Sequence, residues 1–113
     1  MDNKAKGKYG EDLAVSYLKK KGFEIVERNY RHSHGEIDII GMMKNELLIF
    51  VEVKSRKGNN YGEPETFVSS AQQKLIISTA EHYIYAINWM KDIRFDIVSI
   101  IGQKVDHIED AFY

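Results

Sequence analysis

Near the start of the chain, hydrophobic and polar residues follow the period of an amphipathic helix. Between residues 8 and 21, Tyr9, Leu13 and Tyr17 recur at helical spacing. Gly22 follows where a left-handed C-cap is expected, because glycine adopts a positive φ without steric cost. The pattern therefore predicts a helix that ends just before Gly22.

A second helix is predicted in the C-terminal half. Ser69-x-x-Gln72 and Ser70-x-x-Gln73 are both candidate capping boxes for its first turn. Its core-facing stripe is expected at Ile76, Ala80, Tyr83, Ile87 and Met90. The stretch before it, residues 57–64, holds two Gly, two Asn and the only Pro of the chain, which is typical of an exposed loop.

Five short segments rich in β-branched and aromatic residues are predicted to be strands. They span residues 23–28, 36–41, 47–54, 94–101 and 104–108. The run 47–54 is apolar on both of its alternating faces, so we expect it to be the central strand and to be covered on both sides. This predicts an α/β fold in which a sheet of about five strands is flanked by helices on both faces.

Composition favours a single domain over residues 1–113, because a chain of 113 residues with 43% hydrophobic content can bury one core without disulfides. The chain has no cysteine, its N-terminus is polar, and no apolar run approaches the ~18 residues of a membrane span. We therefore expect a cytoplasmic protein without a membrane partner. The net charge of -1 gives no overall attraction to nucleic acid, so a basic contact surface must be local.

Three charged residues stand inside the two most apolar strands. Asp38 lies in the segment 36–41, and Glu52 and Lys54 lie in the segment 47–54. Charges in central strands cost free energy unless they are paired or bind a metal ion. Because side chains alternate along a strand, Glu52 and Lys54 point to the same side.

The loop between these two strands decides whether Asp38 joins the other charges. Facing residues of an antiparallel pair keep a constant sum of residue numbers, and only an odd-length loop places all three charges on one face. A three-residue loop, 43–45, meets this condition, and Asn45 suits the left-handed conformation that such loops need. Asp38 would then face Phe50, with Glu52 as its diagonal neighbour.

Two neighbouring carboxylates repel each other, and a hard divalent cation removes the repulsion. Magnesium is the expected cation, with manganese as a substitute, since Mg²⁺ binds through one or two carboxylates plus water and phosphate oxygens. Such an ion polarises a phosphoryl group, while Lys54 would orient or deprotonate the attacking water. The alternative is a salt-bridge cluster of Asp38, Lys54 and Glu52 that serves stability alone.

Ordered motifs extend along nearly the whole chain. They are Lys6-Gly7-x-x-Gly10-Glu11-x-x-Ala14, Asn29-Tyr30-Arg31, Gly35-Glu36-Ile37-Asp38-Ile39-Ile40, Val51-Glu52-Val53-Lys54-Ser55-Arg56, Lys74 and Arg94-Phe95-Asp96. This set resembles the YraN family, whose members are similar to Holliday-junction resolvases within the PD-(D/E)XK nuclease superfamily. The resemblance implies a restriction-endonuclease-like fold with a mixed central sheet.

The resemblance also implies roles for individual residues. Asp38 and Glu52 would ligate the metal, and the carbonyl of Val53 would add a ligand. Lys54 would assist the water. Glu11 matches the helical acidic residue of the superfamily pattern and would reach the metal directly or through water. An ordinary acidic residue favoured by the helix dipole is the alternative for Glu11.

Four further residues are candidates for phosphate binding. Gln73 or Lys74 is implied by the resemblance. Arg31 and Arg56 are candidate phosphate clamps, because a guanidinium group can donate two parallel hydrogen bonds to a phosphate. An arginine on a loop or strand end that is only solvated or paired is the alternative for both.

The leading hypothesis is a magnesium-dependent endonuclease that acts on DNA, either branched or with exposed ends, as the similarity to resolvases implies. The alternative is a non-catalytic nucleic-acid-binding or protein-interaction module on the same fold, because the acidic balance argues against tight DNA binding by a monomer. A homodimer would pool the small basic patches. Arg94 and Asp96 are expected to be structural partners that brace the site rather than reactants.

Overall fold

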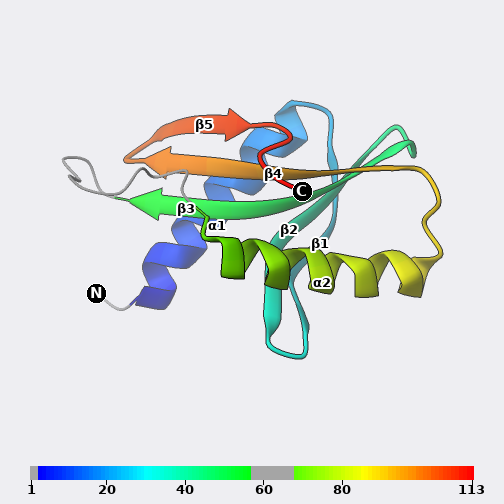
Figure 1. Ribbon diagram of the computed structural model, residues 1–113. Coiled ribbons are helices and arrows are strands. Elements are labelled where there is room, and N and C mark those ends of the chain that lie inside the picture. Colours follow the sequence, from blue (N-terminus) through cyan, green and yellow to red (C-terminus); the bar gives the residue numbers. More distant parts are fainter. Residues whose placement is uncertain (1–2, 57–67) are drawn as a thin grey trace.

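The structure is a computed structural model that describes residues 3–56 and 68–113, with side chains described from residue 8 onward (Figure 1). The described residues form two helices and five strands. Their bounds are α1 Asn3–Lys20, β1 Glu24–His32, β2 Gly35–Met43, β3 Leu47–Arg56, α2 Ser70–Ile87, β4 Asp92–Ile101 and β5 Lys104–Ile108. The loop predicted over residues 57–64 lies outside the described residues.

The five strands form one sheet in the order β1-β2-β3-β4-β5. β3 and β4 are parallel and the other neighbours are antiparallel, so the sheet is mixed. A parallel pair needs a long crossover connection, and α2 is part of it. The predicted α/β class, the five-stranded sheet and the central position of the run 47–54 are confirmed.

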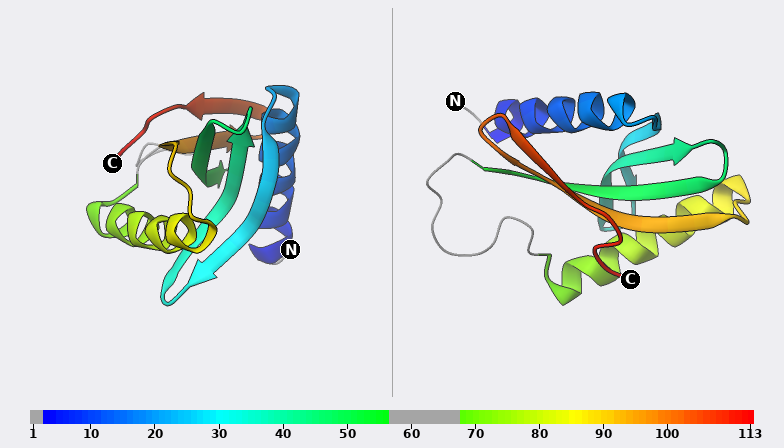
Figure 2. Two further views of the ribbon diagram at one scale, coloured as in Figure 1. Left: turned by 90° about the vertical axis from the view of Figure 1, so that its right-hand side faces the viewer. Right: turned by 90° about the horizontal axis from the view of Figure 1, so that it is seen from above.

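Two buried clusters use alternate residues of β3. One cluster joins α1 to Ile49 and Val51, and the other joins α2 to Leu48 and Phe50. Because neighbouring residues of a strand point to opposite faces, each helix packs against a different set of β3 side chains. In Figure 2 the strands pass between α1 and α2.

Capping residues set the ends of both helices. Gly22 follows α1 with φ 106, as predicted. Ser69 is the N-cap of α2, and its side chain accepts a hydrogen bond of 3.1 Å from the Gln72 N–H. Asn88 ends α2 in the left-handed conformation with φ 57. The first of the two candidate capping serines is therefore the one that caps.

Some predicted boundaries and burials are wrong. α1 begins at Asn3 rather than near residue 8, and β1 continues to His32 rather than ending at residue 28. The predicted stripe of α2 holds for its first three members but fails for Ile87 and Met90, which are 40% and 85% exposed. Ile87 is the last residue of α2, and Met90 lies beyond the cap at Asn88, so it no longer follows the helix face.

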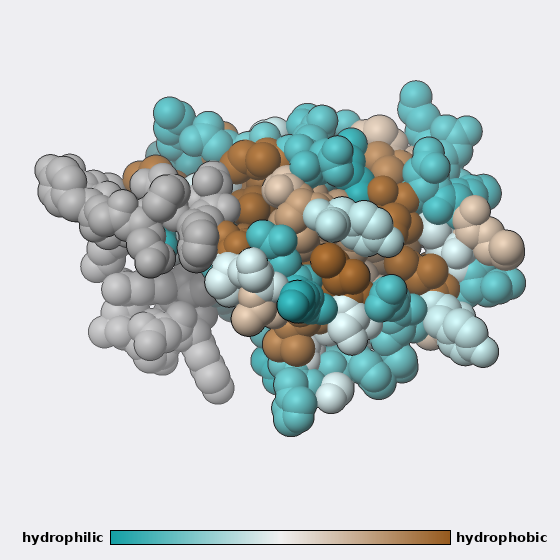
Figure 3. Space-filling model, viewed as in Figure 1, coloured by the Kyte–Doolittle hydropathy of each residue, from teal (hydrophilic) through white to brown (hydrophobic). Residues whose placement is uncertain are grey.

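The surface shown in Figure 3 has apolar residues near the middle of this face with polar side chains around them. None of the helices within residues 3–56 and 68–113 combines the length and the apolar character needed to cross a membrane.

Candidate active site where β2 and β3 separate

Backbone pairing between β2 and β3 runs from Met43↔Leu47 to Ile39↔Val51. The connecting loop therefore has three residues, but it is Lys44–Glu46 rather than 43–45, because Met43 still belongs to the strand. The expected odd length and the left-handed Asn45, with φ 58, are confirmed.

The shifted loop changes the partner predicted for Asp38. Phe50 pairs with Ile40, so the expected pairing of Phe50 with Asp38 is wrong. The pairing stops one residue before Asp38, and continuing its register would place Asp38 opposite Glu52. The two acidic residues thus lie where β2 and β3 separate.

Side-chain alternation along β2 breaks at Asp38. Ile37 and Ile40 belong to the cluster under α2, whereas Ile39 belongs to the cluster under α1. In the β1–β2 register, Asn29 lies opposite Asp38 and has φ 53. A positive φ in a non-glycine residue marks a local departure from regular strand geometry. Strict alternation therefore does not describe β2 at this point.

Each of the two strand carboxylates receives a hydrogen bond from an uncharged donor. The N–H of Val53 donates to Oδ2 of Asp38 over 2.8 Å. Nε2 of Gln72, in the first turn of α2, donates to Oε2 of Glu52. The backbone N–H of Val53 on β3 thus binds the side chain of Asp38 on β2 instead of a backbone carbonyl of β2.

The carboxyl group of Glu52 is buried, with 9% of the residue exposed. Burial raises its pKa to about 9, and a hydrogen bond and the negative charge of Asp38 act in the same direction, while the Lys54 charge opposes them. The carboxyl group of Asp38 is therefore near enough for its charge to act on Glu52. Such a pair is favoured by a proton or by a cation between its members.

Glu11 reaches the same region from α1. Burial raises its pKa and the charge of Asp38 adds to the effect, whereas a hydrogen bond from Asn29 and the charge of Arg28 lower it. Nη2 of Arg28 lies 3.6 Å from Oε1 of Glu11 and 2.8 Å from Oδ1 of Asp12. The predicted helical acidic residue thus stands near Asp38, with an arginine beside it.

Close packing of α1 against β3 places Glu11 there. A Cβ on Gly10 would lie 2.7 Å from Cβ of Ser55 and 2.8 Å from its Oγ. Only glycine therefore allows the helix to approach β3 this closely without a shift. Gly10 precedes Glu11, so the helix approach and the position of the acidic side chain are linked.

Lys54 is half-buried on β3 and near enough to Glu52 for its charge to lower the pKa of that carboxyl group. Within the described residues, no carboxylate oxygen lies within 4.0 Å of its ammonium nitrogen. The alternative of a closed salt-bridge cluster of Asp38, Lys54 and Glu52 is therefore not what the described residues form.

The four candidates for phosphate binding lie in different settings. Nε of Arg31 donates to Glu36 over 3.0 Å on an exposed surface. The carbonyl of Arg56, at the end of β3, accepts a hydrogen bond from a backbone N–H of the turn after β4. Nε2 of Gln73 donates to the carbonyl of Val68, and Lys74 is exposed on α2.

Sequence reasoning missed three residues that contact the acidic side chains: Arg28, Asn29 and Gln72. The sequence indicates only a helix-capping role for Gln72, and its backbone N–H does have that role. The available signal was its place in the first turn of a helix that follows the central strand. Arg28 and Asn29 carried no signal beyond their polarity.

A divalent cation fits the chemistry of this donor set. No group of three or more His, Asp or Glu side chains within the described ranges is arranged to enclose a metal ion by itself. Magnesium does not require such a cage, because it binds through one or two carboxylates and keeps several waters. Asp38 and Glu52 supply two carboxylates, and the charge of Asp38 acts on Glu11 from the same region.

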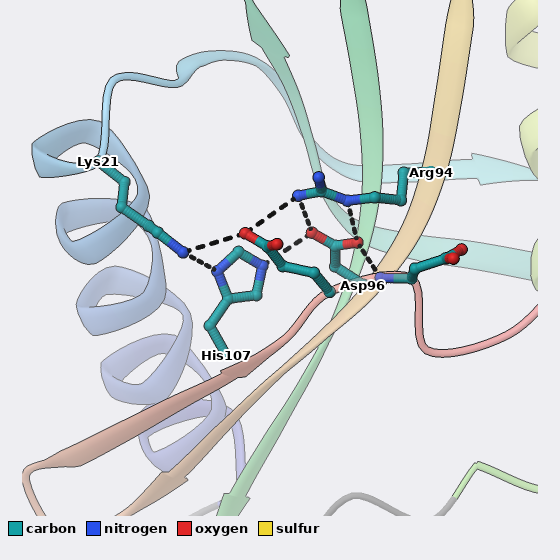
Figure 4. A network of polar contacts seen from close by, with 6 residues as sticks. Lys21, Arg94, Asp96 and His107 are labelled. Atoms are coloured by element: carbon teal, nitrogen blue, oxygen red, sulfur yellow. Dashed lines mark hydrogen bonds and ion pairs between the residues drawn. The ribbon is translucent and has the colours of Figure 1, made fainter.

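A second buried carboxylate, Asp96 of β4, is fully paired (Figure 4). Nε and Nη2 of Arg94 each donate to it over 2.8 Å, and Nε2 of His107 lies 2.7 Å away. The N–H of Asp110 adds a bond of 3.0 Å, and Nζ of Lys21 lies 3.0 Å from Nδ1 of His107. Arg94 and Asp96 are thus structural partners, as the sequence analysis expected.

Fold and site together define a small α/β protein with a mixed five-stranded sheet, in which the central strands and the first helix bring acidic side chains together. Residues 10–100 match the model of the Uncharacterised protein family UPF0102, and the chain belongs to this family. UPF0102 is the YraN family, so the resemblance stated from the motifs is confirmed.

Relatives resemble the chain over nearly its full length. A UPF0102 protein of Cytophaga hutchinsonii is 44% identical over 112 residues, which cover 98% of each chain. One of Clostridioides difficile is 46% identical over 115 residues, covering 99% of this chain and 100% of the relative. One of Clostridium perfringens is 46% identical over 117 residues, covering 97% and 95%.

Proposed function

We propose that the protein is a magnesium-dependent nuclease of the PD-(D/E)XK type that hydrolyses phosphodiester bonds in DNA, branched or with exposed ends. The observation that carries the proposal is the meeting of Asp38 and Glu52 where β2 and β3 separate. A buried carboxyl group beside a half-buried one, with no ion-paired cation among the described residues, is a costly arrangement for stability alone. The two core clusters, one under each helix, support the layered architecture of that class.

The acidic residues would hold the cation. Asp38 and Glu52 would be direct ligands, Glu11 would act directly or through water, and the carbonyl of Val53 stays a predicted ligand. A magnesium ion bound there polarises the phosphoryl group and lowers the pKa of a bound water. Manganese meets the same ligands and would substitute.

Lys54 would act on the water and on the phosphate. Its Nζ carries no carboxylate partner among the described residues, so it is free to orient the attacking water and to hold charge on the phosphoryl oxygens. The water oxygen forms a bond to phosphorus, and the bond from phosphorus to the leaving sugar oxygen breaks. The proton lost by the water passes to solvent, or to Lys54 where its amine is neutral, and the leaving oxygen takes one from solvent.

Arg56 is the best placed of the phosphate-binding candidates. Glu52, Lys54 and Arg56 are spaced two residues apart on β3, so their side chains face the same side of the strand. Each lies about 7 Å along the strand from the next. A guanidinium group at that distance would bind a phosphate next to the reacting one. Arg31, Gln73 and Lys74 would extend the contact surface along the hairpin and α2.

The test is a cleavage screen with Mg²⁺ or Mn²⁺ over single-stranded, duplex, flap and four-way-junction DNA, with RNA counterparts of the first two. We expect cleavage of at least one DNA substrate, its loss in Asp38→Asn and Lys54→Ala, and its retention in Lys104→Ala, which removes an exposed lysine on β5. Cleavage that survives in Asp38→Asn would contradict the proposal. Binding without any cleavage would favour the non-catalytic module.

A further inference from the structure

Gln72 makes one hydrogen bond within the start of α2 and one to the central strand. Its backbone N–H donates to Oγ of Ser69, which caps the helix. Its side-chain Nε2 donates to Oε2 of Glu52. The side chain therefore does not return to the cap, as a capping box would require, but extends to the carboxyl group on β3.

Close packing of α2 on the β1–β2 hairpin holds this arrangement. A Cβ on Gly35 would lie 1.9 Å from Oγ1 of Thr79 and 3.1 Å from the carbonyl oxygen of Leu75. Thr79 is also buried, and its hydroxyl donates to the Leu75 carbonyl over 2.8 Å. These contacts hold α2 at a short distance from β2, and the hydrogen bond from Gln72 to Glu52 links the start of the same helix to β3.

The chemistry of the contact matters as much as its position. The nitrogen of a glutamine amide is only a donor, and the group carries no charge. It therefore fixes one oxygen of Glu52 without neutralising the carboxylate, as the Val53 N–H does for Asp38. Oδ1 of Asp38 and Oε1 of Glu52 are left without an N–H donor among the described residues.

We infer that Gln72 is a positioning residue for Glu52: its amide holds Oε2 and so presents Oε1 for a divalent cation. The inference rests on the proposed function only for the presence of that cation. Donors behind a metal ligand fix its orientation, and their loss typically weakens metal binding about 10- to 100-fold. Gln72 would contact neither the cation nor the substrate.

Gln73 provides a matched control for metal binding measured without DNA, because its proposed contact is with phosphate and not with the cation. It is the next residue of the same helical turn, and its Nε2 donates to the backbone carbonyl of Val68 over 2.9 Å rather than to a carboxylate. Gln72→Leu and Gln73→Leu each remove one side-chain amide from the first turn of α2 and keep a similar volume. Only Gln72→Leu removes a donor from Glu52. Gln72→Ala serves as a second variant if the leucine packs badly.

The experiment is a calorimetric titration of Mn²⁺ into wild type and the variants, with the melting temperature of each measured without metal. We expect about 10- to 100-fold weaker Mn²⁺ binding in Gln72→Leu and Gln72→Ala. Gln73→Leu should bind Mn²⁺ with an affinity within about twofold of that of wild type. Its melting temperature without metal should fall further than that of Gln72→Leu, because the loss of the bond to Val68 loosens the helix start.

The outcomes separate this inference from the proposed function. Wild-type affinity in both Gln72 variants would overturn the positioning role even if the protein cleaves DNA. Equal losses in Gln72→Leu and Gln73→Leu would overturn it as well, since they would reflect the helix start rather than Glu52. Mn²⁺ binding that depends on Gln72, in a protein that cleaves nothing, would support the inference and contradict the nuclease. Absence of Mn²⁺ binding by wild type would overturn the inference.

Discussion

Two buried carboxyl groups in one sheet, those of Asp96 and Glu52, have opposite shifts in pKa. Asp96 of β4 is 0% exposed, and burial alone would raise its pKa, but hydrogen bonds from His107, Arg94 and the Asp110 N–H hold that pKa below its ordinary value. Glu52 of β3 faces another carboxylate and an uncharged amide, and its pKa is raised to about 9. The first site is fully paired within the protein, whereas Glu52 has no ion-paired cation among the described residues.

This contrast distinguishes a buried carboxylate that stabilises the fold from one that is suited to binding a cation or a proton. A buried charge that serves stability is surrounded by opposite charge and donors, as Asp96 is by Arg94 and His107. A like-charge pair with neutral donors behind it lacks a positive partner and is typical of sites that bind a cation or hold a proton. The same protein thus contains its own structural reference for the candidate active site.

The largest expected effect is the loss of folding stability when the buried carboxylate of Asp96 is removed. Asp96→Asn should lower the free energy of unfolding by about 3–5 kcal/mol, because it leaves Arg94 without its buried counter-charge. Denaturant unfolding of the purified variant measures this. Mn²⁺ affinity should stay near that of the wild type, provided the variant is measured under conditions where it is folded. A stable Asp96→Asn would break the contrast between the two sites.

Lys54→Ala should have its largest effect on cleavage. We expect a rate about 10²- to 10⁴-fold lower, because the group that positions the water is removed. The free energy of unfolding should change by less than about 0.5 kcal/mol, since the lysine is in no ion pair with another described residue. Mn²⁺ binding should remain or tighten, because a like charge leaves the pocket.

The salt dependence of DNA binding gives a second test of the role of Lys54. The slope of log affinity against log salt should shrink by about one unit at most for Lys54→Ala, as for the loss of one phosphate contact. Unchanged cleavage in this variant would point to a contaminating nuclease or to a different site.

The raised pKa of Glu52 and the lowered pKa of Asp96 imply pH dependences of stability with opposite signs. Its carboxyl group has a pKa of 4.5 as an ordinary side chain and about 9 in the folded chain, so the folded state keeps a proton that the unfolded state has lost between these values. Stability from this group is complete below pH 4.5 and is lost as pH rises toward 9. The lowered pKa of Asp96 instead stabilises above its ordinary pKa of 3.8, and this contribution is lost on acidification.

Glu52→Gln tests that sign. The amide resembles the protonated acid, so the metal-free variant should be more stable than wild type at pH 8 by about 1–2 kcal/mol, with a flatter stability profile over the intervening range. Thermal unfolding of both proteins at several pH values, without metal, measures the difference. A variant that is less stable than wild type at every pH would show that Glu52 is not under repulsion.

The smallest expected effect is the thermal shift caused by metal. Millimolar Mg²⁺ or Mn²⁺ should raise the melting temperature of wild type by a few degrees, on the order of 1 kcal/mol, because the cation binds only the folded state. Asp38→Asn should lose this rise while its metal-free melting temperature stays equal or increases. A rise of equal size in the variant would place the metal elsewhere.

Much of the fold could be predicted because the informative residues act locally. The run 47–54 is apolar on both faces and became the central strand, and Gly22 and Ser69 ended and began helices through their own backbone preferences. The face shared by Glu52 and Lys54 also follows from strand alternation. The prediction for Met90 failed because a periodic pattern does not reveal that the helix is capped at Asn88.

The rest of the site depends on contacts between distant segments. The loop register was one residue off, since nothing in the sequence distinguishes Met43 as strand from Met43 as loop. The break in alternation at Asp38 arises with the positive φ of Asn29 across the hairpin. The bond from Gln72 to Glu52 joins positions 20 residues apart. Sequence periodicity carries no information about such pairings.

One titration tests the central claim, that Asp38 and Glu52 form a divalent-cation site. Mn²⁺ is titrated calorimetrically into wild type and Glu52→Gln at pH 7, in two buffers of different ionisation enthalpy, so that both binding and proton release are measured. We predict binding by wild type with release of nearly one proton per ion, and loss of both in the variant. Binding that is equally strong in Glu52→Gln, or that releases no proton from wild type, would contradict the account.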